Sequence, residues 1–500
     1  MTDRLHAFTL ADMVREQART LGPATAVVDG ADRLSFAAMD RASNRWAHRL
    51  ADRGVGAGDR VAWLGPGDAR TLHALFAAAK LGAVLVPLNL RNTAAETAWA
   101  LRAAGPAVVL TTTAHLPLTA GVDGLTVVDV EAPDEARALE AAPDGDIDPG
   151  ADSDGGHDDE RPVLGVFTGA FSGRPRLALV THRAIVTQSL VIAAYRLVEP
   201  GATRYLASGP MFHVGVHLKL LATYLFGGRA VLAPAADAET LCRLVQDERV
   251  TSALLFTPTI DRMAEVNAGG RFDLSSLRDV PAQPSGDGAA WYAMTGCPRP
   301  DGPGTTGYGQ TETYAMATFE ARGPAGDGAF GRPSPVAVVR IEGPGGAEAA
   351  AGEAGEITVR GPQVMAGYAD APPPAGRHRT GDLGIRHPDG TLDFLGPIQE
   401  VIKTGMENVY PAEVEIALKR HPAVADACVF GVPDPRWGQS VRAAVELTGG
   451  AECDPADLIE HTRRHIASYK KPRSVAIAAR LPRTAGGGLD RAAIREKWGQ

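Results

Sequence analysis

Cysteine is scarce in this chain of 500 residues. The four cysteines are scattered and include no CxxC pair; they are Cys242, Cys297, Cys428 and Cys453. A disulfide framework and a zinc site are therefore not expected, because both need paired or clustered cysteines. The chain also lacks an apolar run long enough to cross a membrane, and a signal-peptide core behind its charged first residues. We therefore expect no membrane partner, and the cytoplasm is the simplest location.

An excess of positive charge is absent as well. Lysine and arginine number 50 against 59 aspartate and glutamate residues, which gives a net charge of −9. A nucleic-acid partner is therefore not expected, although a local basic patch stays open. The composition, 45% hydrophobic and 22% charged, is that of a globular protein. Five hundred residues exceed one ordinary core, so we expect one large domain and a small one.

Short apolar runs alternate with amphipathic segments in the first third of the chain. Helices are expected at residues 35–51 and 71–81. Strands are expected at 61–64, 83–88, 108–111, 125–130 and 163–168. This alternation predicts parallel α/β layers. The acidic stretch 131–160, rich in Gly, Pro and Asp, is expected to be a solvated surface loop.

The last hundred residues have the pattern of a separate small domain. A boundary is expected close to Pro397–Glu400, after a β-type stretch at 391–395. The segments that follow are a strand, a helix at 411–420, strands at 425–432 and 441–447, a helix at 455–467, and a tail. No internal repeat is present.

Two short polar motifs suit a nucleoside monophosphate. In Tyr308-Gly309-Gln310-Thr311-Glu312 the tyrosine ring can stack on a base, the threonine hydroxyl can meet a phosphate oxygen, and the glutamate can hold Mg²⁺. In Thr380-Gly381-Asp382 the carboxylate can accept two ribose hydroxyls. Taken singly, each motif is equally well read as a polar turn.

The motifs gain weight from their order and spacing. The chain also carries Pro210 to Gly215 (PMFHVG), Lys403 to Glu415 (KTGMENVYPAEVE), Pro433 to Gly438 (PDPRWG) and Tyr469 to Arg473 (YKKPR). Together these segments resemble the adenylate-forming superfamily that includes acyl-CoA synthetases, over essentially the whole chain. The resemblance implies an α/β fold with a large N-terminal domain, 1–398, of αβ-layered sheets plus a β-barrel-like subdomain. It also implies a small mobile α+β C-terminal domain, 399–500, that rotates about a hinge at Glu400.

The same resemblance implies roles for single residues. Tyr308 and Gly309 would contact adenine, Thr311 and Glu312 the phosphate and a Mg²⁺ ion, and Asp382 the ribose. Gly405, with Met406, would line a channel for the pantetheine arm of CoA, and Gly405 suits a turn with positive φ. His213 would be the catalytic gate between acyl pocket and channel. On periodicity alone, a histidine in the core is the better interpretation of His213.

Further residues are candidates for CoA and for the acyl group. Trp437 could stack on the CoA adenine, and a cationic cluster could bind its phosphates; the cluster is Arg463, Arg464, Lys470, Lys471 and Arg473. For any one of these residues, a solvated basic helix face or a core tryptophan is the simpler alternative. The acyl pocket is expected to include Met211 and Val214 within 211–216, Phe256 within 256–259, and residues 283–285.

Residues with which this family binds and activates ATP are replaced in this chain. The family's phosphate loop reads Thr-Ser-Gly-Thr-Thr-Gly-x-Pro-Lys-Gly, whereas this chain has Gly169, Ala170 and Phe171 early in the loop and Arg176-Leu177 at its end. A phenyl ring removes a donor and fills space where converging donors must hold phosphates. Gly488 stands in place of a late catalytic lysine. Other departures are Glu400 for a hinge aspartate, Pro397 for an arginine near the ribose, and Pro281-Ala282-Gln283-Pro284 for Gly-Gly-Ala-Pro.

The retained residues serve thioester formation, and the lost ones serve adenylation. The sequence therefore predicts a non-adenylating acyl-CoA ligase of bacterial secondary metabolism, resembling the ligases of platensimycin and platencin antibiotic biosynthesis. It would take a preformed acyl-adenylate from a separate adenylating synthetase and transfer the acyl group to CoA, releasing AMP. Three alternatives stay open: a full ATP-dependent synthetase, an inactive adenylate-binding scaffold, and transfer to a carrier protein. The acyl group, the oligomeric state and the need for Mg²⁺ stay open.

Overall fold

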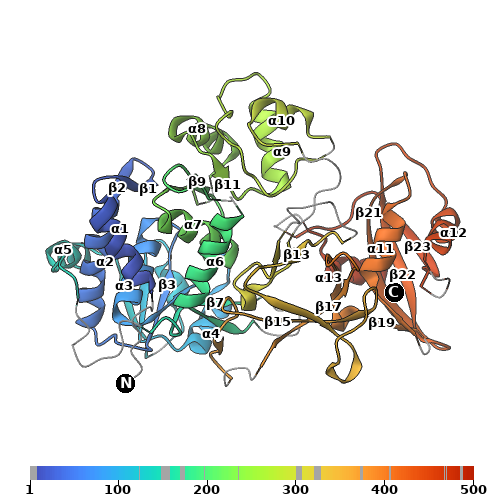
Figure 1. Cartoon of the computed structure of the whole chain (residues 1–500), viewed down its shortest axis with the longest axis horizontal. Coiled ribbons are helices and arrows are strands. Elements are labelled where there is room, and N and C mark those ends of the chain that lie inside the picture. Colours follow the sequence, from blue (N-terminus) through green and yellow to red (C-terminus); the bar gives the residue numbers. More distant parts are fainter. Residues whose placement is uncertain are drawn as a thin grey trace.

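The computed structural model (Figure 1) describes residues 8–122, 124–147, 158–168, 175–195, 198–234, 236–285, 287–299, 307–319, 328–371, 376–404, 407–466, 468, 470–484 and 488–499. The α-helices are α1 (Leu10–Leu21), α2 (Phe36–Ala51), α3 (Ala69–Leu81), α4 (Ala94–Ala104), α5 (Pro133–Ala141), α6 (His182–Ala194), α7 (Val214–Leu225), α8 (Ala238–Glu248), α9 (Thr257–Val266), α10 (Ala289–Met294), α11 (Pro411–Lys419), α12 (Pro455–His465) and α13 (Arg491–Trp498). Among the described residues, none of these helices has the length and apolar character needed to cross a bilayer.

Two largely parallel sheets form the N-terminal part. The seven-stranded sheet has the order β16 (Gly367–Tyr368), β8 (Leu177–Thr181), β7 (Pro162–Phe167), β4 (Val84–Pro87), β3 (Arg60–Leu64), β5 (Val108–Thr111) and β6 (Thr126–Asp129). The five-stranded sheet has the order β11 (Ser252–Ala253), β9 (Arg204–Ala207), β10 (Arg229–Leu232), β1 (Thr25–Asp29) and β2 (Asp32–Ser35). The strands and helices predicted from the first third of the chain are confirmed within one or two residues. Most of these strands arise from short apolar runs, which are buried on both faces of the sheet.

The prediction of a loop over 131–160 is wrong in part, because α5 lies within it. The helix begins with Pro133 at a position where a missing N–H is harmless, and Asp134 and Glu135 lie in its first turn. The acidic composition that suggested a loop is therefore the usual charge of a helix N-terminus. Glu135 also binds Arg49 of α2 and Arg53, two residues beyond the end of α2, which docks the helix on the large domain.

An antiparallel sheet follows, in the order β14 (Val338–Glu342), β15 (Ala354–Arg360), β17 (His378–Arg386) and β18 (Leu392–Pro397). The separate pair β12 (Thr318–Phe319) and β13 (Arg332–Pro333) lies nearby in sequence. These strands correspond to the part that was predicted to be barrel-like. They carry the ribose-motif residue Asp382 in β17, opposite Pro397 of β18.

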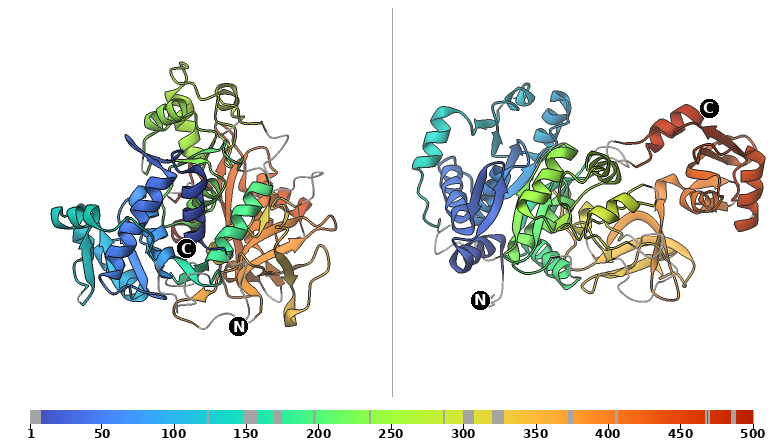
Figure 2. Two further views of the ribbon diagram at one scale, coloured as in Figure 1. Left: turned by 60° about the vertical axis from the view of Figure 1, so that its left-hand side comes forward. Right: turned by 90° about the horizontal axis from the view of Figure 1, so that it is seen from above.

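The C-terminal elements stand to one side of the rest (Figure 2, orange to red). Their sheet contains β19 (Ile402–Thr404), β20 (Glu407–Val409), β21 (Val424–Asp434) and β22 (Gly438–Leu447), and β23 (Ser474–Ala478) pairs with β22. The tail, for which no element was predicted, contains β23 and α13 (Arg491–Trp498). The pair β22–β23 is parallel, so α12 serves as its crossover, a connection that short-range patterns do not reveal.

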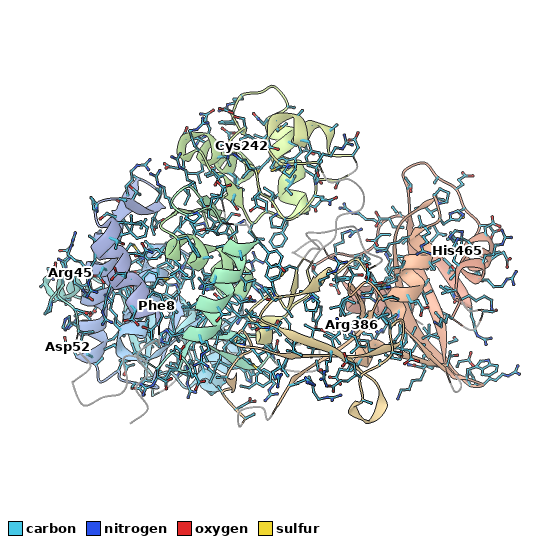
Figure 3. The ribbon with its side chains drawn as sticks, in the orientation of Figure 1. Phe8, Arg45, Asp52, Cys242, Arg386 and His465 are labelled. Carbon is cyan, nitrogen blue, oxygen red and sulfur yellow. The ribbon has the colours of Figure 1, made fainter. Side chains whose placement is uncertain are left out.

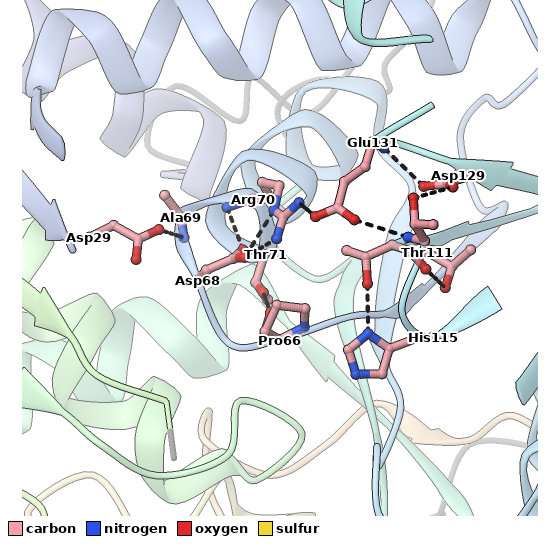
Figure 4. A network of polar contacts seen from close by, with 12 residues as sticks. Asp29, Pro66, Asp68, Ala69, Arg70, Thr71, Thr111, His115, Asp129 and Glu131 are labelled. Carbon is pink, nitrogen blue, oxygen red and sulfur yellow. Dashed lines mark hydrogen bonds and ion pairs between the residues drawn. The ribbon is translucent and has the colours of Figure 1, made fainter. Parts of the chain in front are cut away.

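The carboxyl edge of the seven-stranded sheet contains a polar network (Figure 4). The chain steps from β3 to β4 on one side and then to β5 on the other, which makes the β3–β5 crevice a switch point where such sheets often bind ligands. Here the Arg70 guanidinium bonds to Asp68 and, at 2.6 Å, to Glu131, which also accepts the Thr113 N–H at 3.0 Å. Because these groups satisfy one another, we place the candidate site elsewhere.

Candidate active site

The loop that follows Tyr308 is closely packed against itself and is held in place by Gln188. A Cβ added to Gly309 would lie 1.3 Å from the carbonyl oxygen of Ala315, so only glycine fits there. Tyr314 and Ala315 have φ of 44° and 71°, a region that non-glycine residues seldom adopt. The Gln188 amide donates to the carbonyls of Tyr314 and Met316, at 3.2 and 2.7 Å, and holds this turn in place. Left-handed backbone at such a loop is typical of functional sites.

Tyr308 and Gln310 converge on Asp382. The Tyr308 hydroxyl donates to Oδ2 of Asp382 at 2.7 Å, and the Gln310 amide nitrogen lies 3.2 Å from the same oxygen. His378 donates to the Gln310 carbonyl at 2.8 Å, which fixes the orientation of the amide. Among the described residues Oδ1 of Asp382 has no hydrogen-bond partner. One carboxylate oxygen is thus held in position, and the other is available for a hydroxyl.

Burial and hydrogen bonding act in opposite directions on the pKa of Asp382. Burial raises this pKa above its ordinary value, and the two donors partly offset the rise because they stabilise the carboxylate. Burial, reinforced by the Asp382 charge, raises the pKa of the Tyr308 hydroxyl, which stays a donor. Tyr308 is only 6% exposed and packs against Phe394, with ring centroids 5.6 Å apart. Its stacking on adenine stays a prediction, and only a small part of the ring is available for it.

A second chain of contacts begins at Glu312. The Tyr368 hydroxyl donates to its Oε1 at 2.6 Å. The Arg176 guanidinium lies over the Tyr368 ring, 3.6 Å from the centroid, and its Nη2 is 2.9 Å from Asp370 Oδ1. Arg176 occupies the position where the phosphate loop was expected to carry a lysine. Its charge is directed to Tyr368, which belongs to β16, and to Asp370, two residues beyond it.

Other parts of the predicted phosphate and pantetheine sites fall outside the described residues. These are the loop positions 169–174 and the channel residues Gly405 and Met406, so their roles stay predictions. Gly488 is described. Its carbonyl accepts the Thr484 N–H at 2.8 Å, and among the described residues a Cβ there would come within 4 Å of the Thr484 hydroxyl alone, at 3.8 Å. The absence of a side chain at 488 is therefore no requirement of the fold.

His213 stands at the N-terminus of α7 and is exposed, so the alternative of a core histidine is wrong. Its ring lies 5.0 Å from that of Phe212. Enclosure by neighbouring groups lowers its pKa, and the positive charge of Arg91 adds to this effect. The core histidine of this helix is His217, which is fully buried and bonds to the Met211 carbonyl. His213 is thus accessible and largely neutral at pH 7.

The candidate acyl residues lie at the start of α7 for Met211 and Val214, and at the start of α9 for Phe256. Met211 and Val214 are 4% and 8% exposed, whereas Phe256 is 48% exposed. The Thr257 hydroxyl donates to the Gln283 carbonyl at 2.8 Å, which joins the segments 256–259 and 283–285. Phe256, at the start of the first of these segments, is a large apolar side chain left exposed.

The candidate CoA residues are already engaged with other groups. The Trp437 ring is covered by the guanidinium groups of Arg436 and Arg473, at 4.7 and 5.3 Å. Lys470 binds both oxygens of Glu413, at 2.6 and 2.8 Å, and Lys471 donates to the Ser468 carbonyl at 3.4 Å. Arg463 and Arg464 both bind Glu460 on α12, as on an ordinary solvated helix face. Arg473 is exposed.

The predicted hinge residue is bound to the last helix. Glu400 lies 3.3 Å from Arg491 of α13, and Arg491 forms a bidentate pair with the buried carboxylate of Glu415, at 2.7 and 2.6 Å. Sequence patterns gave no sign of this contact, because residues 400, 415 and 491 lie far apart in the chain.

Comparison with known proteins identifies the family. The "AMP-binding enzyme" family matches residues 14–369, and the "AMP-binding enzyme C-terminal domain" matches residues 413–487. The chain belongs to the AMP-binding, adenylate-forming acyl-CoA synthetase superfamily. It is 34% identical to a feruloyl-CoA synthase of an Amycolatopsis species, over 97% of this chain and 98% of that protein. It is 32% identical to the indoleacetate–CoA ligase of Aromatoleum aromaticum, over 93% of each. Its structure resembles ATP-bound MatB from Rhodopseudomonas palustris, with a TM-score of 0.82 and 25% identity over 99% of each chain.

Membership of this superfamily confirms the predicted family, the predicted fold class and an acyl-CoA ligase type of activity. The fit of a magnesium ion can be tested on Glu312, one oxygen of which is engaged by Tyr368. Among the described residues no group of three or more His, Cys, Asp or Glu side chains is suited to a metal. A divalent ion would therefore depend on substrate phosphates for most of its ligands.

Sequence reasoning missed several residues of the site. Gln310 stood inside a quoted motif without a role, and His378 and Tyr368 belonged to no motif. Their importance comes from partners 56 to 72 positions away in the chain. Only a histidine two residues before Thr380 and a tyrosine near the acidic Asp370 hinted at polar contacts in this region.

Proposed function

We propose that this protein is a non-adenylating acyl-CoA ligase, which joins a preformed acyl-adenylate to CoA and releases AMP. The observation that supports this most directly is the position of Arg176. The residue that replaces the family's phosphate-loop lysine lies on Tyr368 and is paired with Asp370. A cation so engaged offers less charge to a triphosphate. The absence of a side chain at Gly488 removes a second charge, and loss of one such group costs about 10²–10³ in rate.

The retained groups suffice for the second half-reaction. The CoA thiolate attacks the acyl carbonyl carbon, a C–S bond forms, the bond from that carbon to the AMP oxygen breaks, and the thiol proton passes to solvent. The mixed anhydride is already activated, and a thiol of pKa about 8.5 supplies usable thiolate near neutral pH. Asp382, held by Tyr308 and Gln310, would fix the ribose. His213, exposed at the start of α7, would separate the acyl pocket from the thiol channel. Positioning then supplies most of the rate gain.

The proposal extends to partners and to domain organisation. A separate synthetase would supply the acyl-adenylate, as in the antibiotic pathways whose ligases the sequence resembles. The reaction would take place in the cytoplasm. CoA would enter past Gly405 and Met406, and its nucleotide would contact Trp437, Lys471 and Arg473. Residues 399–500 would rotate against residues 1–398 during turnover, with Glu400 as hinge.

A complete ATP-dependent acyl-CoA synthetase is the second candidate. The relatives named feruloyl-CoA synthase and indoleacetate–CoA ligase favour it, because they match this chain over nearly its full length. In that case Arg176 would leave Asp370 to meet the triphosphate. Aromatic acids such as ferulate and indoleacetate are therefore the first carboxylates to test.

Two assays distinguish the candidates. We expect no ATP–pyrophosphate exchange with ferulate, indoleacetate or linear and bulky acids, and we expect acyl-CoA and AMP from synthetic acyl-adenylates plus CoA without ATP. Robust exchange would establish the second candidate. If the protein formed acyl-CoA no faster than the uncatalysed reaction of CoA with each acyl-adenylate, the protein would be a binding scaffold and not an enzyme.

The variant Gly488→Lys provides a control for the exchange assay. A side chain has room at this position, so the variant should fold. We expect it to restore little exchange, because the phosphate loop still carries Phe171 and Arg176 stays paired. Full recovery by this one change would contradict the proposed defect in the loop.

A further inference from the structure

A buried ion pair lies on the inner part of α7. Lys219 is 8% exposed on a helix whose other residues are almost all apolar and buried. Its ammonium contacts Oδ2 of Asp279, and the Ser252 hydroxyl donates to the same oxygen at 2.9 Å. The Asp279 side chain keeps 34% of its surface exposed. The pair is thus enclosed on the lysine side and open on the aspartate side.

The pair borders the predicted acyl pocket. Lys219 follows Gly215 by one helical turn and shares its face. A Cβ on Gly215 would lie 3.9 Å from Leu254, which precedes Phe256 by two residues. The backbone of Asp279 accepts the Ala253 N–H at 3.0 Å and leads into the segment that ends at 285. Gly215 thus lies between His213, at the start of α7, and Lys219, one turn further along the helix.

The pair is poorly explained as a stabilising device. Removing two charges from water costs several kcal/mol, and apolar residues of similar size serve a helix core as well or better. Burial lowers the pKa of Lys219 from its ordinary value, in keeping with that cost. In ligand pockets, by contrast, a few enclosed polar groups fix the orientation of an otherwise apolar ligand.

The unused bonding capacity of the pair indicates what it would bind. Both hydrogen bonds to the Asp279 carboxylate reach Oδ2, and in the described part of the chain Oδ1 has no partner. The Lys219 ammonium has three protons, and its hydrogen bond to Asp279 uses one of them. The pair is neutral overall, which disfavours a second carboxylate or an ammonium on the ligand. A hydroxyl can donate to Oδ1 and accept from Nζ at the same time.

We propose that Lys219 and Asp279 form the inner end of the acyl pocket and recognise a hydroxyl group at the far end of the acyl chain. This proposal rests on the proposed function, because it takes acyl-adenylates to be ligands of the chain. Both residues would then determine which acyl group is bound, and both would lie at a distance from the reacting carbonyl.

Calorimetry with stable acyl-sulfamoyl adenosines tests the proposal without turnover. The probes are matched pairs: cinnamoyl against its 2-, 3- and 4-hydroxy forms, and octanoyl against 8-hydroxyoctanoyl. We expect one hydroxylated probe to bind about 10–100-fold more tightly than its parent, as for one or two hydrogen bonds to charged groups. Lys219→Met and Asp279→Asn should bring this ratio close to 1 without changing the affinity for AMP.

Lys80→Met is a matched control, since Lys80 is a buried lysine paired with Asp40 in another part of the fold. It should keep the ratio of the wild type. Where Lys219→Met fails to fold, Lys219→Gln and Ser252→Ala replace it. A ratio near 1 for every pair in the wild type, an unchanged ratio in folded variants, or a preference for probes ending in a carboxylate would overturn the proposal. Binding of AMP with no binding of any acyl probe would overturn the proposed function instead.

Discussion

At the scale of single residues, the site is organised around the carboxylate of Asp382. Two donors from the Tyr308 motif occupy one of its oxygens, and the other oxygen stays available. The residue types of this arrangement could be predicted from the sequence, because Tyr308 and Asp382 belong to ordered motifs. The bond between them could not, because 74 positions separate them. The contact of Arg176 with Tyr368 was hidden for the same reason, since it depends on β8 and β16 being neighbours.

We expect the hydrogen bond between Tyr308 and Asp382 to contribute to the affinity for a nucleotide. Tyr308→Phe keeps the ring but removes a hydrogen bond to a charged group, and should weaken AMP binding about tenfold; Asp382→Ala should weaken it 10- to 100-fold. Because the two residues act together, the double variant should lose little more than Asp382→Ala alone. Isothermal titration calorimetry of AMP measures all three. Affinities equal to that of the wild type would mean that these motifs no longer bind a nucleotide.

At the scale of secondary-structure elements, α13 is joined to the rest of the small domain by an ion pair of Arg491 and by its buried Ile494. Its Arg491 pairs with Glu415, which is 6% exposed and also accepts the Val429 N–H at 2.7 Å. The amphipathic helix α2 and the fully buried apolar strand β5 could be predicted from the sequence, because their own residues carry the pattern. β23 and α13 could not, because partners distant in sequence stabilise them. The acidic α5 was missed because its first turn has the composition of a loop.

Replacement of Arg491 by methionine should destabilise the small domain by about 3–5 kcal/mol at pH 8, because a buried carboxylate loses its partner. Burial already raises the pKa of Glu415 above its unfolded value of 4.5. A group with a raised folded pKa stabilises the fold fully below its unfolded pKa and loses that contribution as the pH rises through the folded value. Without Arg491 this pKa rises further, so the loss should shrink toward pH 4.5.

Urea unfolding of wild type and variant at several pH values measures this difference. Arg495→Met, an exposed arginine on the same helix, is the matched control and should change stability by less than about 0.5 kcal/mol. A loss for Arg491→Met that is the same at pH 8 and near pH 4.5 would show that Glu415 does not take up the proton.

At the scale of the whole molecule, four sheets, one of them the short pair β12–β13, stand beside a smaller C-terminal unit. Figure 3 shows side chains filling each part, from Cys242 on α8 to His465 on α12. The connection between them passes through Ile398–Glu400, a single 3₁₀ turn. A rotation about Glu400 would break its contact with Arg491, at 3.3 Å, while the Arg491–Glu415 pair stays within the small domain. This ion pair is partly exposed, so its own contribution to restraining the hinge is about 1 kcal/mol or less.

Glu400→Pro should slow thioester formation, because it restricts φ at the hinge and removes a donor, while leaving acyl-adenylate affinity unchanged. Glu400→Gln is the matched control: it removes the ion pair with Arg491 but not the backbone freedom, and should keep the rate within a few-fold. Rapid-quench measurement of acyl-CoA formation compares the two variants. A normal rate for Glu400→Pro would mean that the arrangement in Figure 1 is already the working one.

The tight packing at Gly309 has a consequence for surveys of genomes. Because any side chain there would strike the Ala315 carbonyl, this glycine would persist in a lineage that had stopped binding nucleotides altogether. A motif search that rewards it measures ancestry of the fold, not retained chemistry. Asp382 is different, since its free oxygen makes no bond that the fold needs. Across large sets of uncharacterised homologues, retention of that aspartate is therefore the better marker for separating active ligases from inactive homologues.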